Sequence, residues 1–572
     1  MHVGQRLVDR LIAHGIHRIF GVPGGQTSPL YHAIGRRQDE IRHVLMRDER
    51  SAAFAADAYA RTSGWVGVCD ATVGPGASNL VSGLLEAYTS SVPLLAIVGD
   101  IPRTWETRRR LGSASQGFDQ RAFLEPCVKH YGRIELPENL DGMLQAALRV
   151  ATSNRPGPAV LEIPDDVFAA QWPGDRRPDR PAAQADYPRL RMAPDPQLVV
   201  QAVAMLARAR RPLILAGGGA HASDAGDDVL RLAERLRAVV ATTVNGKGLV
   251  SETHPLAVGV AGSFGMPHVN RLLGEADCVL LIGTKAGQGA TLNWTLPRPD
   301  ANVIHVDIDG DELGRNFPQT LGLQADAKLG TRALVDALHE APASTWDLGQ
   351  IAELTAAWWR CPVAYGHDEE PDAVKPQDIV RSLREMMGDL DLLVTDASLA
   401  SGWGAAHWLA RRAGRTFLAP RGLAGLGWGL PGTIGAALAL GDRGRPQRVV
   451  CLAGDGGWAY SQSEVETCAR LELPVIAVVL NNSVLAWTKH SMQNRYPEDK
   501  PISQDFSDAD FAAAARALGA VAYRVDTLAD FREALRRAHV HDIGRLVVID
   551  AITSKHQTPV LKPEPAEAMT VY

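Results

Sequence analysis

The sequence predicts an α/β protein with three doubly wound parallel-sheet domains. Apolar strand-like runs alternate with amphipathic helical segments along most of the chain, which is the pattern of parallel α/β folds. With 572 residues, the chain is too long for a single core. Two stretches interrupt the alternation, a linker rich in Pro, Arg and Asp at 171–195 and a helix-and-loop connection at 340–372. We therefore expect domains at 1–170, 190–340 and 372–555.

The first domain alternates helices and strands from its start. Its strands are expected within 17–25, 41–50, 67–76, 93–100 and 158–166, and its helices near 5–14, 27–35, 51–63 and 79–88. The first of these helices is amphipathic and lacks both the long apolar core and the cleavage site of a signal peptide. We therefore expect a cytoplasmic protein.

The second and third domains continue the alternation. Strands of the second are expected within 211–220, 238–246, 277–287 and 302–309. In the third, an apolar run from Val449 to Ala453 ends in a glycine turn, a helix follows through about Leu471, and a second apolar run ends in Asn481-Asn482. Residues 554–572 are too polar and too rich in proline to build a domain.

Composition excludes several classes of partner. The chain is 46% hydrophobic and 22% charged with a net charge of −6, which gives no electrostatic basis for binding nucleic acid or an anionic membrane. No stretch of 18 apolar residues predicts a membrane span. Six cysteines without a CxxC pair are expected to be buried thiols in a reducing compartment. A small molecule is the expected partner.

The strand-turn-helix-strand stretch from Cys451 to Asn482 carries the strongest chemical signal. Parallel sheets bind ligands at the carboxyl ends of their strands, and glycines at a helix start let the backbone approach a phosphate. Asp455 and Asn482 supply one anionic and one neutral oxygen, which suits Mg²⁺ because this ion takes its other ligands from phosphate and water. The stretch predicts a cradle for a magnesium diphosphate; the structural alternative is an ordinary βαβ turn.

This stretch resembles the signature of thiamine diphosphate (ThDP) enzymes, because Gly-Asp-Gly is followed by Asn-Asn with Asn482 27 positions after Asp455. The segments FGVPGGQTSPLYHAI, DERSAAFAADAYAR and ATVGPGASNLVSGLLEAYTSSVPLLAIVGD are similar, in the same order, to segments of the acetohydroxyacid (acetolactate) synthase and pyruvate oxidase branch. The resemblance covers about residues 1–555. It implies a pyrimidine-binding, a central and a diphosphate-binding domain, with ThDP and Mg²⁺ as cofactors.

The resemblance implies a catalytic role for three residues of the first domain. Glu49 would hydrogen-bond N1′ of the cofactor's aminopyrimidine and favour the imino tautomer, and burial against the ring would raise its pKa. The structural alternative is a surface carboxylate that caps a helix. Gln116 matches an active-site glutamine, and the alternative is a plain loop amide. Gln26 would shape the substrate pocket, where many relatives carry a small residue.

Other positions match residues that contact the cofactor in the family. Leu426 would hold the cofactor in its bent shape, and the backbone carbonyl of Val484 would join Asp455 and Asn482 as a Mg²⁺ ligand. Trp487, with Lys489 and His490, would lie in a segment that closes over the substrate. The full set of implied cofactor-binding residues is Pro23, Gly24, Asn79, Ser398, Leu426, Gly454, Asp455, Gly456, Gly457, Asn482, Val484 and Trp487.

The chain also departs from acetohydroxyacid synthases. Leu399-Ala400 stands where those enzymes have Gln-His, so Ser398 and Ser401 are expected to supply hydroxyl donors to the diphosphate. In the central domain, the positions of two arginines and a Met-His pair are taken by Lys285, Gly289 and Ser263-Phe264. These departures argue against FAD and against a reaction of two keto acids. A Gly217–Gly219 turn leaves open a nucleotide or CoA site or a purely structural domain.

The predicted function is that of a ThDP- and Mg²⁺-dependent, acetolactate-synthase-like decarboxylase or carboligase. It would act on a 2-keto acid through a C2 ylid and an enamine. The alternatives are a lyase of 2-hydroxyacyl-CoA or acyloins, similar to benzaldehyde lyase, and an enzyme similar to oxalyl-CoA decarboxylase. A catalytically silent binding or regulatory protein is a further alternative, against which the presence of Glu49, Asp455 and Asn482 argues. Because relatives build each site from two chains, we expect at least a homodimer, and a homotetramer as the full assembly.

Overall fold

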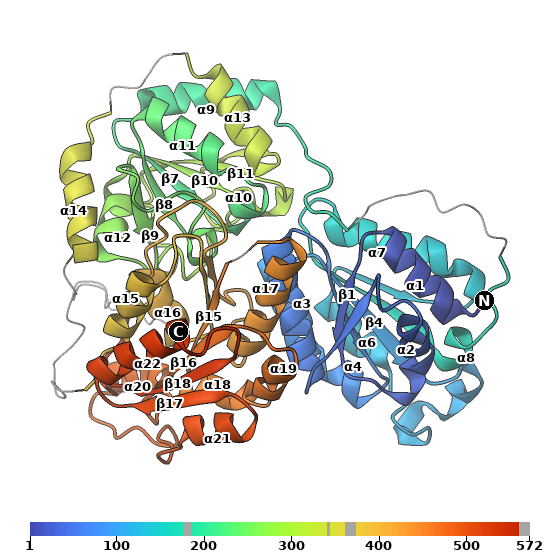
Figure 1. Ribbon diagram of the computed structural model, residues 1–572. Coiled ribbons are helices and arrows are strands. Elements are labelled where there is room, and N and C mark those ends of the chain that lie inside the picture. The colour runs from blue at the N-terminus through green and yellow to red at the C-terminus, as the bar shows by residue number, and fades with distance from the viewer. Residues whose placement is uncertain (175–184, 340–343, 361–372, 446, 560–572) are drawn as a thin grey trace. The chain divides into compact units, whose positions relative to one another are not determined.

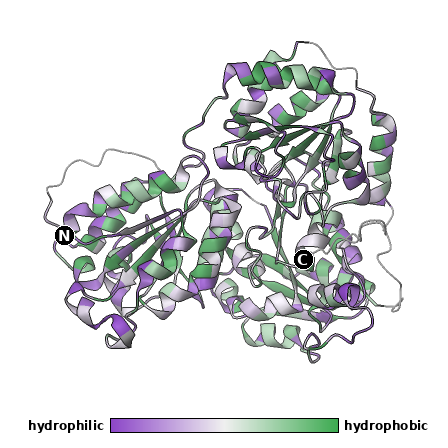
Figure 2. Cartoon of the chain, turned by 180° about the vertical axis from the view of Figure 1, so that it is seen from behind, coloured by the Kyte–Doolittle hydropathy of each residue, from purple (hydrophilic) through white to green (hydrophobic). Residues whose placement is uncertain are grey.

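The computed structural model describes residues 1–174, 185–339, 344–360, 373–445 and 447–559 (Figure 1). These residues form three sheets of six strands each, and all strand pairings within the sheets are parallel. Helices connect the strands, and hydrophobic residues concentrate in the strands (Figure 2). The predicted α/β class with three doubly wound sheets is confirmed. The exact domain boundaries stay a prediction.

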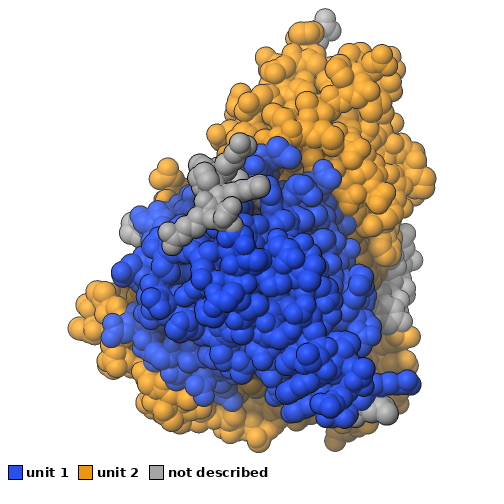
Figure 3. All heavy atoms as spheres, turned by 90° about the vertical axis from the view of Figure 1, so that its right-hand side faces the viewer, with its two compact units in different colours: residues 1–190, 420–446, 461–473 blue, residues 191–419, 447–460, 474–572 orange. Residues whose placement is uncertain are grey.

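The chain divides into two compact units, which Figure 3 draws in blue and orange. Unit 1 comprises residues 1–190, 420–446 and 461–473, so it adds two segments of the third domain to the first. Unit 2 comprises residues 191–419, 447–460 and 474–572.

The first sheet has the strand order β2-β1-β3-β4-β6-β5. Its strands are β1 (Arg18–Gly21), β2 (Arg42–Leu45), β3 (Gly67–Ala71), β4 (Leu94–Asp100), β5 (His130–Arg133) and β6 (Pro158–Pro164). The main helices are α1 (Val3–Ala13), α2 (Ser28–Gly35), α3 (Glu49–Ser63), α4 (Pro75–Asn79), α5 (Val81–Ser90), α6 (Gln120–Leu124), α7 (Leu140–Thr152) and α8 (Asp165–Phe168). The strand prediction missed β5, a short edge strand that is partly exposed along its length and therefore lacks a continuous apolar run.

The central sheet has the order β12-β11-β10-β7-β8-β9. Its strands are β7 (Pro212–Ala216), β8 (Val239–Thr242), β9 (Ala257–Val260), β10 (Cys278–Ile282), β11 (Asn302–Asp307) and β12 (Leu321–Gln324). The helices around it are α9 (Pro196–Arg208), α10 (Gly218–Ala222), α11 (Gly226–Leu236), α12 (Pro267–Glu275), α13 (Ala327–Ala337) and α14 (Leu348–Arg360). The prediction missed the two edge strands β9 and β12, each only four residues long.

The third sheet has the order β14-β13-β15-β16-β18-β17. Its strands are β13 (Leu392–Thr395), β14 (Phe417–Leu418), β15 (Val449–Gly454), β16 (Val475–Asn481), β17 (Val521–Val525) and β18 (Val547–Ile552). The helices are α15 (Pro376–Met386), α16 (Leu399–His407), α17 (Gly429–Asp442), α18 (Asp455–Ser461), α19 (Glu464–Arg470), α20 (Ala486–Arg495), α21 (Phe511–Ala517) and α22 (Leu528–Val540). The predicted order of strand, helical connection and strand from β15 to β16 is present. However, α18 begins at Asp455 directly after β15, so the expected glycine turn is the first turn of a helix, and the single predicted helix is two helices, α18 and α19.

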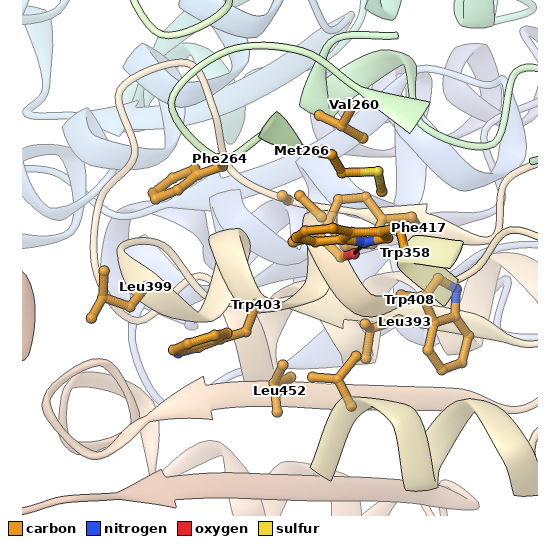
Figure 4. Packing of buried hydrophobic residues seen from close by; sticks show 14 of the residues in the cluster. Val260, Phe264, Met266, Trp358, Leu393, Leu399, Trp403, Trp408, Phe417 and Leu452 are labelled. Carbon is orange, nitrogen blue, oxygen red and sulfur yellow. Dashed lines mark hydrogen bonds between the residues drawn. The ribbon is translucent and has the colours of Figure 1, made fainter. Parts of the chain in front are cut away.

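A tryptophan-rich core joins the central and third sheets within unit 2. Trp358, Trp403 and Trp408 are buried there together with Phe264 and Met266 (Figure 4). The indole nitrogen of Trp358 donates a hydrogen bond to the carbonyl of Ala406 at 3.0 Å. Helix α14, which follows the central domain in sequence, is thereby fixed to the third domain.

The cysteines and the helix lengths bear on two further predictions from the sequence. The five cysteines that the structure describes are free thiols and buried, as expected, and Cys361 lies outside the described residues. Within the described ranges no helix combines the length and the apolar character needed to cross a bilayer.

Helix α17 lies along α3 within unit 1, and a glycine makes this close approach possible (Figure 1). A Cβ atom at Gly435 would lie 2.0 Å from the backbone carbonyl oxygen of Ala55, whereas a Cβ at Gly441 of the same helix would meet nothing within 4 Å. The spacing of the two helices therefore depends on Gly435.

We expect Gly435→Ala to lower the free energy of unfolding. Separating the two helices costs about 1–3 kcal/mol, which exceeds the gain of about 1 kcal/mol in helix propensity. Gly441→Ala, the matched control, should gain propensity without the clash. Chemical denaturation of both variants would measure the difference; equal shifts in the two would contradict this account of the interface.

Candidate active site

The predicted site residues fall into both compact units. Unit 1 contains Glu49, its neighbours in the first domain and Leu426. Unit 2 contains Ser398–Ser401, Asp455 and Asn482–Trp487. Glu49 and its neighbours follow strands of the first sheet, whereas Leu426 and the residues of unit 2 follow strands of the third sheet.

Glu49 is the first residue of α3 and is nearly buried, with 9% of its surface exposed. The cap of this helix is the preceding residue, Asp48, whose carboxylate accepts hydrogen bonds from the backbone amides of Arg50 and Ser51. Glu49 is therefore not needed as a helix cap, which removes the structural alternative raised by the sequence. Its Oε2 instead accepts a hydrogen bond from Nδ2 of Asn79 at 3.0 Å.

The turn after β3 brings backbone close to the Glu49 carboxylate. Gly76 has so little space that a Cβ atom there would lie 3.0 Å from Oε1 of Glu49. Gly74 has a left-handed φ of +74°, and a Cβ there would lie 2.6 Å from the backbone oxygen of Gln116. The two glycines thus place Asn79 and the loop of Gln116 beside Glu49.

Gln116 itself is exposed and has a left-handed φ of +62°. Its backbone contacts the Gly74 turn, and a catalytic role of its side chain stays a prediction. The buried amide of Gln120, which the sequence analysis missed, supports the same turn: its Oε1 accepts from the Gly74 amide at 3.0 Å, and its Nε2 donates to the Gly99 carbonyl at 3.1 Å. No local pattern distinguishes Gln120 from other loop amides.

Gln26 lies in the short 3₁₀ turn Gly25–Thr27 and is held by a second residue missed from the sequence. The hydroxyl of Thr72 donates to Oε1 of Gln26 at 2.9 Å. A Cβ at Gly24 would lie 2.2 Å from Cβ of Thr72, so the Pro23-Gly24 turn rests directly on the end of β3. Gln26, Gly24 and Glu49 therefore all surround the segment that begins at Thr72.

In unit 2, Asp455 and Asn482 lie side by side at the ends of the paired strands β15 and β16. The Asp455 carboxylate accepts hydrogen bonds from the Gly456 amide at 2.7 Å and from the Asn482 amide at 3.1 Å. Oδ1 of Asn482 accepts from the Val484 amide at 3.2 Å. The spacing of 27 residues is thus explained by the two helices α18 and α19 and the one strand β16 that lie between the two residues.

Burial raises the pKa of Asp455 from its usual value to about 6, although four surrounding backbone amides act in the opposite direction. A buried carboxylate that is ionised at neutral pH is suited to receive a metal ion. A Cβ at Gly454 would meet nothing within 4 Å, so the chain is open at this turn. The oxygen donors and the open space at Gly454 fit Mg²⁺ and a phosphate. The ligand roles of Asp455, Asn482 and Val484 stay a prediction.

Helix α16 starts beside this turn. A Cβ at Gly457 would lie 2.9 Å from the carboxyl carbon of Asp396, just before α16. Ser398 has an unusual φ of +64°, and such strain concentrates at functional sites. Ser401 does not fit the expectation for a free hydroxyl donor, because its Oγ donates to the Asp396 carbonyl at 2.7 Å and is fully buried.

The segment after Val484 forms α20 and contacts the central domain. Trp487 packs edge to face against Phe264, with ring centroids 5.5 Å apart. Lys489 forms an ion pair with Asp505 at 2.7 Å, and burial, reinforced by neighbouring charged groups, lowers the pKa of His490. The buried ring of Phe264 in the central domain therefore helps to hold α20 through Trp487.

The Gly217–Gly219 turn of the central domain is explained by close packing. A Cβ at Gly217 would lie 2.4 Å from the Gly283 carbonyl oxygen, and the Gly219 amide donates to that oxygen at 2.9 Å. The Gly289 carbonyl accepts a hydrogen bond from the Ser263 amide at 2.8 Å. The purely structural alternative for the triple glycine is therefore sufficient.

Comparison with known families gives three matches in chain order. "Thiamine pyrophosphate enzyme, N-terminal TPP binding domain" matches residues 1–123, the central domain of the same family matches residues 199–334, and its C-terminal TPP binding domain matches residues 396–551. Thiamine pyrophosphate is another name for ThDP.

Curated relatives match over almost the whole chain. A probable acetolactate synthase large subunit of Methanocaldococcus jannaschii is 33% identical over 98% of this chain and 94% of its own. The acetolactate synthase large subunit of Parasynechococcus marenigrum is 33% identical over 90% of this chain and 81% of its own. The large subunit of acetolactate synthase isozyme 1 of Escherichia coli is 31% identical over 86% of this chain and 83% of its own.

Proposed function

Since the chain belongs to the thiamine pyrophosphate enzyme family, among relatives named acetolactate synthase large subunits, we propose that it is a ThDP- and Mg²⁺-dependent carboligase. It decarboxylates a 2-keto acid and joins the remaining acyl fragment to a carbonyl acceptor. The observation that carries the proposal is Glu49: it is nearly buried, it is not used as a helix cap, and it is oriented by Asn79.

The cofactor and the protein divide the chemistry. When bound, ThDP supplies the electron sink that lets a carbon–carbon bond beside a carbonyl break. Glu49 holds a proton at the cofactor's pyrimidine ring, and the Asn79 amide keeps its carboxylate in one orientation. Asp455, Asn482 and the Val484 carbonyl would hold Mg²⁺, whose charge would offset that of the diphosphate. Leu426 would contact the cofactor, and the Gln26 and Gln116 side chains would orient the substrate.

FAD is not required in this proposal. Gly289 takes an arginine position without providing a cation, and Lys285 supplies a single charge where relatives have a guanidinium. The Gly217–Gly219 turn is used for packing against Gly283. A flavin absorption spectrum in the purified protein would refute this part of the proposal.

We also propose the assembly and the domain limits. Domains at 1–170, 190–340 and 372–555 would form a cytoplasmic homodimer, doubled to a homotetramer, with a small-molecule substrate and no nucleic acid or membrane partner. Buried free thiols and the mild net charge of −6 support this setting. Light scattering at several concentrations would test the assembly.

The decisive test is turnover of pyruvate by the purified protein with ThDP and Mg²⁺, followed by NMR. Acetolactate, acetoin or acetaldehyde that disappears when ThDP is omitted would support the keto-acid reaction and identify the acceptor. No turnover, with ThDP bound and a thermal shift on adding CoA, would refute it in favour of a lyase of 2-hydroxyacyl-CoA.

The pKa of Asp455 predicts how metal binding depends on pH. Because burial raises this pKa to about 6, the carboxylate is ionised and ready for a cation above pH 6, and a proton competes with the cation below it. The dissociation constant should be nearly constant between pH 7 and 8 and rise about tenfold per unit below pH 6. Mn²⁺ titration of the ThDP-free chain, followed by electron paramagnetic resonance, avoids protonation of the diphosphate. Equal affinities at pH 5 and 7 would contradict the prediction.

A further inference from the structure

Glu86, on α5, is a fully buried carboxylate that no part of the proposed reaction uses. Its Oε1 accepts hydrogen bonds from the Gly422 amide at 3.1 Å, from Arg61 at 2.9 Å and from Ser90 at 2.7 Å. Its Oε2 accepts from the Ala424 amide at 2.9 Å. One side chain of the first domain thus binds two amides of the segment that precedes α17.

Asp57, on α3, makes a second connection to the same segment. Its Oδ2 accepts a hydrogen bond from the indole nitrogen of Trp428 at 3.0 Å. Arg61 lies between the two carboxylates, 2.9 Å from each, and its guanidinium stacks over the Trp428 ring at 5.4 Å from the ring centroid. Asp57, Arg61 and Glu86 are therefore one buried ionic cluster.

A buried ionic cluster contributes little net free energy to folding. Removing three charged groups from water costs several kcal/mol per group, and an apolar core of equal volume often stabilises as well or better. Charged side chains that are fully hydrogen-bonded hold the groups they bind in a single geometry. Here those groups are backbone amides at 422 and 424 and the side chain of residue 428.

Leu426 lies between the two connections, two residues after Ala424 and two before Trp428. On the earlier side the backbone packs closely against α5: a Cβ at Gly422 would lie 2.3 Å from Oγ1 of Thr89, and Ala424 has a left-handed φ of +60°. On the later side Trp428 is fully buried. The segment is thus fastened on both sides of Leu426, by helices of which one, α3, begins with Glu49.

We propose that Glu86, together with Asp57 acting through Trp428, is a positioning residue that sets where Leu426 supports the cofactor. This inference rests on the proposed function, in which Leu426 contacts ThDP. Loss of the Glu86 contacts would leave the diphosphate end bound and let the segment move, so that the bent cofactor conformation is weakened before the fold is.

Two variants test the proposal by different routes. Glu86→Gln keeps the shape of the side chain but presents an amide NH₂ to one of the backbone amides, and Gly422→Ala displaces the segment while every charge stays in place. Gly441→Ala is the matched control, because a Cβ at that position meets nothing within 4 Å.

The readouts are the ThDP dissociation constant in saturating Mg²⁺ and the near-ultraviolet circular dichroism band of the bound imino tautomer. We expect both variants to weaken ThDP at least tenfold, or to lose at least half of the band at saturation, while Gly441→Ala matches the wild type. A folded Glu86→Gln and a folded Gly422→Ala that both keep the wild-type constant and band would overturn the proposal.

The outcomes separate this inference from the proposed function. If Glu86→Gln does not fold, Gly422→Ala decides alone, because it removes no charge. A wild-type chain that binds ThDP without turning over pyruvate would refute the proposed reaction, yet the binding constant and the band would still test Glu86. A wild-type chain that does not bind ThDP at all would refute both.

Discussion

Glu49→Gln is expected to lower ThDP-dependent turnover of a 2-keto acid by about 10²–10⁴-fold, the usual contribution of a positioned acid–base group. The amide has nearly the same shape and still reaches Asn79, so the fold and the site geometry should persist. It cannot take up or release the proton that the reaction needs. The loss should therefore appear in the maximal rate, with the affinity for ThDP changed much less.

The measurement is single-turnover and steady-state kinetics at saturating ThDP and Mg²⁺, beside direct ThDP binding. Glu40→Gln is a suitable control, because Glu40 is an exposed carboxylate of the same domain that pairs with Arg37. A Glu49→Gln enzyme with more than one tenth of the wild-type rate would exclude Glu49 as the proton-handling residue.

Asp455→Asn is expected to abolish metal-dependent retention of ThDP. The substitution removes the one carboxylate of the Asp455–Asn482 pair. The NH₂ group of the new asparagine would also face the backbone amide of Gly456 or Asn482, so that two donors meet. Changes to residues that merely support a metal ligand already cost 10–100-fold in affinity, so loss of an anionic ligand should weaken Mg²⁺ by more than about 100-fold.

Mn²⁺ binding to the ThDP-free variant, and ThDP retention after gel filtration with Mg²⁺, would measure this loss. Glu353→Gln removes an exposed carboxylate from the same unit, on α14, and should bind both as the wild type does. Wild-type Mn²⁺ affinity in Asp455→Asn would mean that the diphosphate site lies elsewhere in the chain.

Much of the architecture is encoded locally. The alternation of buried strands with amphipathic helices, read over windows of ten to twenty residues, is enough to predict three parallel sheets. The predicted strand ranges omitted the edge strands β5, β9, β12 and β14, which have two to four residues and so offer few positions for a periodicity. In the third domain they also omitted β13, β17 and β18.

The sequence by itself was enough to predict a site where its residues lie within one unit of strand, helix and strand. Asp455 and Asn482 come at the ends of consecutive apolar runs, and parallel strands necessarily bring such ends to one edge. The role of Glu49, which lies between a strand and a helix, was predicted only from the resemblance of its segment to ThDP enzymes, because its position alone is equally typical of a helix cap. For Asp455 and Asn482 the local order of the sequence suffices, because the pairing of neighbouring parallel strands brings the two residues together.

Only the tertiary structure decided which groups orient these residues. Gln120 supports Gly74 across 46 residues, and Glu86 binds the Gly422 amide across 336. It also showed that Asp48 caps α3 and that the Ser401 hydroxyl is used within its own turn. Hydrogen bonds between distant segments leave no periodic trace in a sequence, because any amide or carboxylate could make them and only packing selects the one that does.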